Sequence, residues 1–442
     1  MIEKNAEFTK ALDRMENTHT NLFITGRAGT GKSTLLNYFR SITKKKIVVL
    51  APTGVAAVNV GGQTIHSFFG FTPQTTPDTV KNPRKNDDNI EMYRELDAIV
   101  IDEISMVRAD LFDCVDVFLR KVGKDRRKPF GGVQMILIGD LYQLPPVVTK
   151  QDEDVFNERY SSPYFFSARV CVGNRQRQIV EEELFTLEMI ELEKMYRQTD
   201  EHFISLLNAV RDATLTPEQL VLLNQRRVED TFDHRDYNGI WLTTTNKLAS
   251  EVNRVRLKEL EESERVFTGK VEFTFDRSAF PTEAELVLKV GARVMILHND
   301  PWGKWHNGSM GTVTGFIVGE DQEEKISVTL DSGDDVLIGK YTWEMHRFYF
   351  DPSTKQIESE TVGSFIQYPL KLAWAVTIHK AQGKTFDRIM LDIGNGSFVS
   401  GQVYVALSRC TSLNGLQLRR QLQRAHVWMD PLVAAFVEIH RN

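Results

Sequence analysis

Short apolar runs alternate with amphipathic stretches between residues 20 and 180. Runs of this length that are rich in β-branched residues are typical of buried parallel strands. They occupy Leu22–Thr25, Ile47–Leu50, Ala98–Asp102 and Met135–Gly139. Turn residues and helix-like periodicity lie between them. The alternation predicts a doubly wound α/β domain built on a parallel sheet.

The pattern changes in the second half of the chain. Over residues 286–350, glycines and β-branched residues alternate in short segments, which predicts a small β-barrel or sandwich. On both sides of this stretch the α/β pattern returns, so the barrel is expected to be inserted into a second α/β domain. The strands expected there are Phe185–Glu193, Ile240–Thr243 and Arg388–Ile393, and the helices are Asn246–Glu261, Leu370–Ala381, Gly401–Cys410 and one that Thr216 caps before Pro217.

These patterns divide the chain into two α/β domains with one insertion each. The first insertion is polar and proline-bearing. The predicted parts are a first domain at 1–71 and 95–182, its insertion at 72–94, a second domain at 183–285 and 363–442, and its β-rich insertion at 286–362.

Composition adds limits but no function. The net charge of −6 argues against a nucleic-acid ligand, yet a motor needs only a local basic track, so the total charge does not decide. The three cysteines show no metal-ligand or disulfide spacing, so each is expected to be a small core residue in a reducing cytosol. No apolar run approaches the roughly 20 residues of a membrane span, and the polar N-terminus carries no export signal. A cytoplasmic location is expected.

The strongest motif is GRAGTGKS at residues 26–33. It matches G-x-x-x-x-G-K-[ST] and lies between a predicted strand and a predicted helix, which is the context that a phosphate-binding loop requires. Lys32 is expected to reach the β- and γ-phosphates of ATP, and the Ser33 hydroxyl to bind Mg²⁺. A glycine-rich turn that binds nothing is the alternative, and the flanking elements disfavour it. The expected ATP-binding residues of the loop are Gly26, Ala28, Gly29, Thr30, Gly31, Lys32, Ser33 and Thr34.

Two further strands end in polar residues. Asp102 and Glu103 follow the first of these strands, at the end where parallel sheets bind ligands. Asp102 is expected to hold Mg²⁺ and Glu103 to orient or deprotonate water. Gln143, in GDLYQLPP (139–146), is a candidate sensor of the γ-phosphate. Taken alone, the acidic pair could be solvated surface charge and GDLYQLPP a polar turn. Downstream of a phosphate loop, the pair favours ATP hydrolysis.

Hydrolysis of ATP also calls for a cation that faces the γ-phosphate. Arg197 and Arg409 are the candidates, although residue chemistry alone does not single them out among the 54 basic residues.

Eight motifs, in order along the chain, resemble those of superfamily 1B helicases, and most of all the petite integration frequency (Pif) family of 5′→3′ DNA helicases. They are GRAGTGKS, APTGVAA (51–57), TIHSFFG (64–70), IDEISM (101–106), GDLYQLPP, MYRQ (195–198), TIHKAQGKTFD (377–387) and YVALSRC (404–410). The resemblance implies two RecA-like P-loop NTPase domains with ATP between them, a small wedge at 72–94 and an SH3-like barrel in the second domain.

The resemblance also implies roles for individual residues. Arg197, Gly383, Lys384 and Arg409 match residues that serve the nucleotide from the second domain. The residues that match DNA contacts are Pro52, Thr53, Gly54, Thr64, His66, Ser67, His379 and Lys380. Further candidates for binding DNA are Phe68, Pro145, Asn307 and Gly308.

Residue chemistry weighs against some of these assignments. A structural, hydrogen-bonded histidine remains the alternative for His66 and His379. Phe68 fits a core better than a stacking surface, whereas Trp302 and Trp305 lie in a loop-like stretch. Many family members carry, upstream of the phosphate loop, a glutamine that recognises the adenine base.

Residues 1–21 contain no glutamine, so Asn5 and Asn17 are the candidate substitutes. The absence of a glutamine puts adenine selectivity in doubt.

The function that follows is an ATP-dependent 5′→3′ DNA helicase. It uses ATP and Mg²⁺, moves on single-stranded DNA and opens forked or tailed duplex, a G-quadruplex or an RNA–DNA hybrid. It is expected to act as a monomer at the nucleoid, beside replication or repair proteins. The alternatives are a RecD-like helicase subunit, a nucleotide-gated DNA clamp that hydrolyses ATP without unwinding, and a P-loop kinase or metabolic ATPase.

Overall fold

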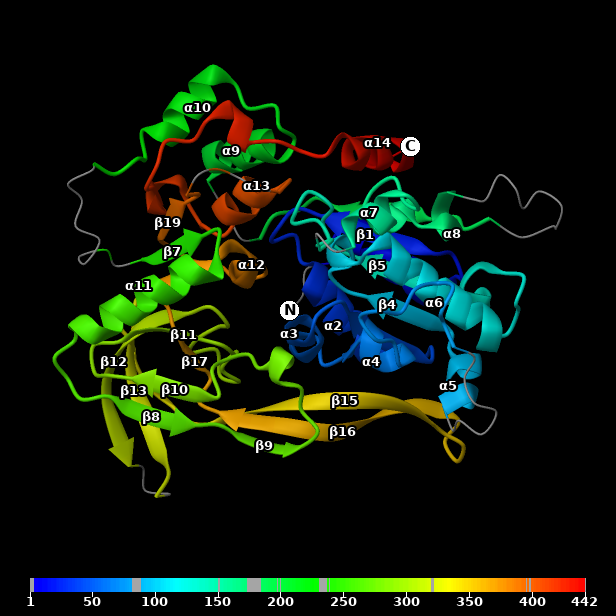
Figure 1. Cartoon of the computed structure of the whole chain (residues 1–442), viewed down its shortest axis with the longest axis horizontal. Helices are drawn as coiled ribbons and strands as arrows, with labels where there is room; N and C mark the ends of the chain where they lie inside the picture. The colour runs from blue at the N-terminus through cyan, green and yellow to red at the C-terminus, as the bar shows by residue number, and fades with distance from the viewer. Residues whose placement is uncertain are drawn as a thin grey trace. The chain divides into compact units, whose positions relative to one another are not determined.

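A computed structural model describes most of the chain in two compact units (Figure 1). The described residues are 4–81, 89–149, 152–172, 184–196, 198, 200–229, 237, 239–318, 322–394, 396 and 399–441. The first unit comprises Met1–Tyr196, Glu344–Gly363 and Asp430–Asn442, and the second comprises Arg197–Trp343 and Ser364–Met429. Within these ranges, no helix has both the length and the apolar character needed to cross a membrane.

A six-stranded sheet forms the centre of the first unit, in the order β3-β2-β4-β5-β1-β6. All of its pairings are parallel, which confirms the α/β class. The strands are β1 (Leu22–Gly26), β2 (Ile47–Ala51), β3 (Gln63–Thr64), β4 (Ala98–Ile101), β5 (Gln134–Ile138) and β6 (Glu188–Leu192). The helices are α1 (Ala6–Asn17), α2 (Lys32–Ile42), α3 (Gly54–Asn59), α4 (Ile65–Phe69), α5 (Asn89–Glu95), α6 (Ala109–Val122), α7 (Glu153–Asn157) and α8 (Arg169–Val172).

Alternate residues of the central strands face opposite sides of this sheet. Leu22 and Ile24 pack with apolar residues of α1 and α2 in one core. Phe23 points to the other face, where its ring contacts Phe165 and Phe436. Both faces of β1 are therefore covered, which explains why the strand is apolar along its length.

Three segments join the first unit although the sequence pattern placed them elsewhere. Strand β6 pairs with β1, with Leu22 opposite Glu188 and Gly26 opposite Leu192. Helix α14 (Pro431–His440) carries Phe436, whose ring stacks on that of Phe166 with the ring centroids 4.5 Å apart. The predicted boundaries put β6 and α14 in the second domain. The local sequence pattern of a strand or helix predicts its type but not the sheet against which it packs.

The third segment is the hairpin tip 344–363, which was predicted within the β-rich insertion. It belongs to β15 (Tyr341–Asp351) and β16 (Gln356–Gln367). The Phe348 amide donates a hydrogen bond to Gln63 Oε1 at 3.4 Å, and the Phe348 ring lies 6.2 Å from that of Phe68. Of the predicted insertion at 72–94, residues 82–88 lie outside the described part, and the rest ends in α5.

The second unit contains a four-stranded parallel sheet, in the order β18-β7-β19-β20. Its strands are β7 (Ile240–Thr243), β18 (Ala375–Thr377), β19 (Ile389–Asp392) and β20 (Leu416–Leu418). The helices of this unit are α9 (Glu201–Arg211), α10 (Pro217–Asn224), α11 (Asn246–Glu259), α12 (Ile378–Ala381) and α13 (Gln402–Leu407). Thr216 and Gln219 form the capping box that starts α10, with Pro217 in its first turn.

The prediction of a helix over Leu370–Ala381 is wrong. Residues Leu370–Leu372 form β17, which pairs with β11 through Leu370 opposite Ile296 and Leu372 opposite Val294. Strand β18 and the single turn α12 follow. The apolar run fits either a buried helix or a strand, and the neighbouring strands decide in favour of the strand.

The β-rich character predicted for 286–350 is confirmed, and it extends beyond both ends. One antiparallel sheet has the order β14-β13-β12-β11-β17, with β11 (Arg293–Ile296), β12 (Met310–Val318), β13 (Glu324–Leu330) and β14 (Asp335–Ile338). Strands β8 (Arg265–Thr268) and β10 (Glu285–Leu288) form a pair, and β9 (Lys270–Phe273) borders the β15–β16 hairpin. A single apolar core joins residues of the five-stranded sheet and of β8 and β10 to Trp305 and Trp374.

Candidate nucleotide and nucleic-acid sites

The phosphate loop connects β1 to α2, as the sequence predicts. Gly26 has φ 148° and Gly31 has φ 89°, conformations that favour glycine. A Cβ atom at Gly26 would lie 2.5 Å from the carbonyl oxygen of Leu192, so a side chain is excluded there. The Thr30 hydroxyl donates to the carbonyl of Arg27 at 2.9 Å and closes the turn. The loop thus has the tight backbone that wraps phosphate groups.

Lys32 is the first residue of α2, and its ammonium lies over the loop. Lys32 Nζ donates to the carbonyl of Gly26 at 2.6 Å and to that of Arg27 at 3.0 Å. Ser33 and Thr34 are exposed on the same first turn. The helix therefore presents a cation and two hydroxyls beside its own N-terminus, where anions are stabilised.

Asp102 and Glu103 come directly after the buried strand β4. Burial raises the pKa of Asp102, and the backbone N–H of Glu103 and the charge of Lys32 oppose that rise. The charge of Lys32 therefore acts on the Asp102 carboxylate, although Lys32 begins helix α2 and Asp102 follows strand β4. Glu103 has φ 52° and ψ 44°, a left-handed conformation that costs about 1–2 kcal/mol for a residue with a side chain. Strain of this kind clusters at functional sites.

Gln143 follows β5 and is held by Asp140, a residue that the sequence analysis did not single out. Gln143 is 6% exposed and Asp140 is 1% exposed. Gln143 Nε2 donates to Asp140 Oδ2 at 3.2 Å, and the Tyr142 amide donates to Asp140 Oδ1 at 3.1 Å. The detectable signal was a carboxylate immediately after a buried strand. Because β1, β4 and β5 are parallel neighbours in one sheet, their carboxyl ends bring Lys32, Asp102 and Gln143 to the same edge.

Tyr196 is a second residue that the sequence analysis did not assign. Its amide donates to the carbonyl of Gly29 at 3.0 Å. Tyr196 is 50% exposed, and its ring would lie 3.7 Å from a Cβ atom added at Gly31. An exposed aromatic ring therefore covers the phosphate loop. The two asparagines considered as adenine readers make local hydrogen bonds: Asn5 caps α1 by accepting from the Phe8 amide, and Asn17 donates to Asp13.

Residues predicted to contact DNA in the first unit follow two adjacent strands. Ala51 of β2 is paired with Thr64 of β3. The hydroxyl of Thr53 accepts from the Ala56 amide and starts α3, and the hydroxyl of Thr64 accepts from the Ser67 amide and starts α4. This pairing brings Pro52, Thr53, Gly54, Thr64 and Ser67 to one end of the sheet. Thr53 and Ser67 are exposed there.

His66, Phe68 and Pro145 are less accessible. Burial lowers the pKa of His66 and Arg108 lowers it further, whereas Asp110 raises it, so the ring is neutral at neutral pH. Pro145 is half-buried. Phe68 is 5% exposed and packs edge-to-face on Phe69 and Tyr93. The structure assigns Phe68 to an aromatic core, in agreement with its residue chemistry and against its place among the DNA contacts.

A cluster of lysines occupies the second unit. Lys384 Nζ donates to Asn307 Oδ1 at 2.6 Å. Gly308 is close as well, since a Cβ atom added there would lie 3.5 Å from Cβ of Lys384. Burial and, to a smaller extent, the charge of Lys371 together lower the pKa of Lys384 to about 8. Burial and the charge of Lys380 likewise lower the pKa of Lys371 to about 8, against Glu283. Lys371, which the sequence analysis missed, therefore joins two predicted residues in a site suited to an anion.

The remaining residues of this set lie on α12 and in the turn after it. His379 and Lys380 are exposed on α12, whose first turn is capped by Thr377 through the Lys380 amide. Gly383 follows with φ 78°, immediately before Lys384.

Arg409 is held inside the second unit. It is 1% exposed, and its guanidinium donates to the carbonyl of Val405 at 2.9 Å, the hydroxyl of Ser408 at 2.9 Å and the carbonyl of Lys384 at 3.4 Å. The last bond connects Arg409 to the segment that carries the lysine cluster. Arg197 lies outside the described residues.

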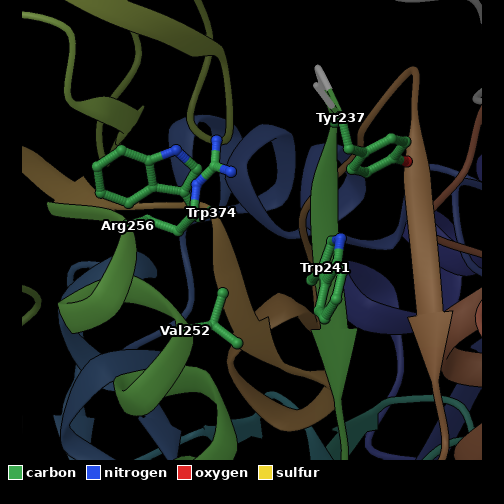
Figure 2. Close-up of a pocket in the computed structure, with 6 residues that line it drawn as sticks. Tyr237, Trp241, Val252, Arg256 and Trp374 are labelled. Atoms are coloured by element: carbon green, nitrogen blue, oxygen red, sulfur yellow. The ribbon is translucent and has the colours of Figure 1, made fainter. Parts of the chain in front are cut away.

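A small cavity lies beside β7 and α11 in the second unit (Figure 2). Its lining residues are Tyr237, Gly239, Trp241, Val252, Arg256 and Trp374. A volume of ≈ 10 Å³ suits about one water molecule. The cavity is far too small for a nucleotide, so it is a feature of the packing and not a candidate site.

The fold and the loop geometry define a P-loop NTPase with a second α/β unit. A sequence model of the PIF1-like helicase family matches residues 2–219. The ATP-dependent DNA helicase Pif1 of Bdellovibrio bacteriovorus is 31% identical over 98% of this chain and 92% of that protein. The crystal structure of Bacteroides sp Pif1 with ADP-AlF4 matches with a TM-score of 0.88 and 33% identity, over 100% of this chain and 98% of that chain. The same protein bound to single-stranded DNA matches with a TM-score of 0.67, 33% identity and the same coverage.

The chain belongs to the PIF1-like helicase family. It is therefore a helicase and an ATP-hydrolysing enzyme, as its motifs indicated.

Proposed function

We propose that this chain is an ATP-dependent DNA helicase that translocates 5′→3′ on single-stranded DNA and separates the duplex ahead of it. The observation that carries the proposal is the shared edge of the first sheet. Lys32, Asp102 and Gln143 lie at this edge, beside the glycine-rich phosphate loop. The names of the similar proteins support DNA as the substrate, since Pif1 helicases are named as DNA helicases and one has been solved with single-stranded DNA.

Within the nucleotide site, each side chain has a distinct task. Lys32 binds the β- and γ-phosphates, and the loop amides from Gly26 to Thr34 surround them. Glu103 orients the attacking water and accepts its proton. Gln143, fixed by Asp140, hydrogen-bonds the γ-phosphate or that water. Tyr196 stacks on the base or ribose of the nucleotide.

Mg²⁺ fits the oxygen donors at this edge. The hydroxyl of Ser33 is exposed on the first turn of α2, and Asp102 supplies a carboxylate. One or two protein oxygens together with phosphates and waters are the usual ligands of this ion. When bound, Mg²⁺ neutralises charge that develops on the phosphates.

From the second unit, we assign Arg197 and Arg409 to the γ-phosphate and Gly383 and Lys384 to the coupling between nucleotide and DNA. DNA is held mainly by its phosphates, through Asn307, His379, Lys380 and the neighbouring lysines, so binding tolerates any sequence. The protein acts as a monomer in the cytoplasm, at the nucleoid, on forked or tailed duplex. We also propose the domain boundaries predicted from the sequence, except that β6, α14 and the hairpin tip 344–363 belong to the first unit.

The direction of travel is tested with two matched duplexes, one with a 5′ single-stranded tail and one with a 3′ tail. We expect ATP-dependent strand separation of the 5′-tailed substrate only, because the DNA residues of both units match those of 5′→3′ motors. Opening of the 3′-tailed substrate alone would contradict the direction but keep the motor. If neither opened while DNA stimulated ATP hydrolysis, a nucleotide-gated clamp would replace the helicase.

The lysine cluster predicts a pH dependence of DNA affinity. Lys371 and Lys384 have pKa values lowered to about 8, so both are largely charged at pH 7 and largely neutral at pH 9.5. Lys380 and Glu283 face Lys371, and Lys371 and Asn307 face Lys384. We expect affinity for an oligo(dT) to fall across this range, by about tenfold for each lysine that contacts a phosphate.

Fluorescence anisotropy at constant ionic strength measures this fall, because phosphate contacts are also weakened by salt. The variant Lys371→Met should bind more weakly at pH 7 and lose part of the pH dependence. The exposed Lys270, whose ammonium bonds Glu272, provides a control variant, Lys270→Met, that should keep the full dependence. An affinity that stays level between pH 7 and 9.5 would contradict a phosphate site at this cluster.

A further inference from the structure

The loop between β11 and β12 displays one tryptophan and buries another. Trp302 is 83% exposed, whereas Trp305 is 9% exposed and belongs to the core of the β-rich insertion. A single exposed apolar residue is common and needs no special explanation. Trp302 differs from such residues because the backbone beneath it is fixed and because its loop also carries a polar site.

Asp300 fixes the backbone of this loop. Its carboxylate accepts the amides of Trp302 and Lys304, both at 3.0 Å. The Asp300 amide donates to the carbonyl of Trp305 at 3.0 Å, and its carbonyl accepts the Gly303 amide at 3.1 Å. Asp300 itself is 8% exposed. The indole of Trp302 is thus presented on a short, closed turn, so little conformational entropy is lost when a ligand contacts it.

The other end of the same loop reaches the lysine cluster. The Asn307 amide donates to Asn299 Oδ1 at 2.8 Å, beside Asp300 in the sequence. Asn307 Oδ1 accepts a hydrogen bond from Lys384 Nζ. The charge of Lys371 acts on this ammonium and lowers its pKa. One compact loop therefore supplies an exposed aromatic ring at one end and contacts a group of cations at the other. Lys304, next to the turn, is exposed as well.

We propose that Trp302 is a stacking platform for a nucleobase of single-stranded DNA whose backbone runs along the lysine cluster. Aromatic rings beside a basic track are the usual means of holding single strands, because every base has a π-face and every nucleotide has a phosphate. The inference rests on the proposed function, since it requires that the chain binds single-stranded DNA. It adds a residue that the helicase motifs do not include.

Affinity for oligo(dT) tests the stacking directly. We expect Trp302→Ala to bind about 5- to 150-fold more weakly than wild type, the range for losing one stacked base. Trp302→Phe should recover much of the affinity, and the basal ATP hydrolysis without DNA should remain at the wild-type rate. A thermal melt that matches wild type will show that the exposed side chain does not stabilise the fold.

Intrinsic fluorescence provides an independent readout. Stacking on a base should quench Trp302, so Trp302→Phe is expected to lose a measurable part of the quenching seen when wild type binds oligo(dT). Trp428 is 42% exposed, and Trp428→Phe is the matched control that should retain the quenching. The inference is overturned if wild type binds oligo(dT) and both Trp302 variants bind and quench like it. If wild type itself fails to bind oligo(dT), the proposed function fails as well.

Discussion

Replacing Lys32 by alanine is expected to lower the kcat for ATP hydrolysis by at least about a thousandfold. Lys32 is the cation of the phosphate loop, and its ammonium already contacts the loop carbonyls of Gly26 and Arg27. Without it, the charge that develops on the γ-phosphate loses its nearest fixed positive partner in the first unit. Glu103→Gln should lose turnover to a similar extent but keep nucleotide binding, because the amide cannot accept a proton from water.

The measurement is DNA-stimulated ATP hydrolysis under saturating ATP, with nucleotide binding measured separately. Lys45 offers a matched control, because its ammonium also bonds backbone carbonyls, those of Met15 and Thr18, but it is not part of the phosphate loop. Lys45→Ala should lower the melting temperature and leave the turnover of the folded protein intact. Retained hydrolysis in either Lys32→Ala or Glu103→Gln would refute the assignment of the site.

Replacing Arg409 by alanine is expected to lower kcat by about a thousandfold and to destabilise the protein. The first effect follows from its assigned contact with the γ-phosphate, by analogy with an arginine finger. The second follows from its position: the side chain is 1% exposed and donates to the carbonyls of Val405 and Lys384. Buried acceptors that lose their donor cost about 1–3 kcal/mol each. Lysine should not rescue turnover, because it cannot reproduce several guanidinium bonds at once.

The two effects of Arg409→Ala can be separated with a second buried arginine. Arg211 of α9 is 3% exposed in the same unit, and we assign it no role in hydrolysis. Arg211→Ala should lower the melting temperature without a comparable loss of kcat in the folded fraction. If Arg409→Ala changes kcat only a few-fold once it is corrected for folded protein, Arg409 is a structural residue and the γ-phosphate is served by other cations.

Local sequence rules were enough to find the nucleotide loop and the first sheet. A buried strand followed by glycines and a capped helix has a short-range pattern, and the strands at residues 22, 47, 98 and 135 all form where the apolar runs predict. Helix N-caps are also set by local sequence. They occur at Thr53, Thr64, Thr216 and Thr377. A hydroxyl bonds an amide two or three residues away, so the chain needs no distant partner to make it.

Long-range pairing decided what the sequence left open. The chain alone could not show that β6 completes the first sheet, that α14 returns to it, or that Leu370–Leu372 pairs with β11 as a strand and not a helix. The same holds for single side chains. Lys371 joins Lys380 and Lys384 only because β17 and α12 fold together, and Trp302 differs from Trp305 only because one points into a core.

The sequence by itself therefore determined the chemistry of the nucleotide loop and the family to which the motor belongs. The tertiary structure decided which residues share a sheet, a core or a cluster of charge. The physical reason is the range of the interactions. Turns, caps and periodicity are settled within a few residues of chain, whereas strand pairing, burial and the mutual lowering of pKa values depend on groups that are distant in sequence.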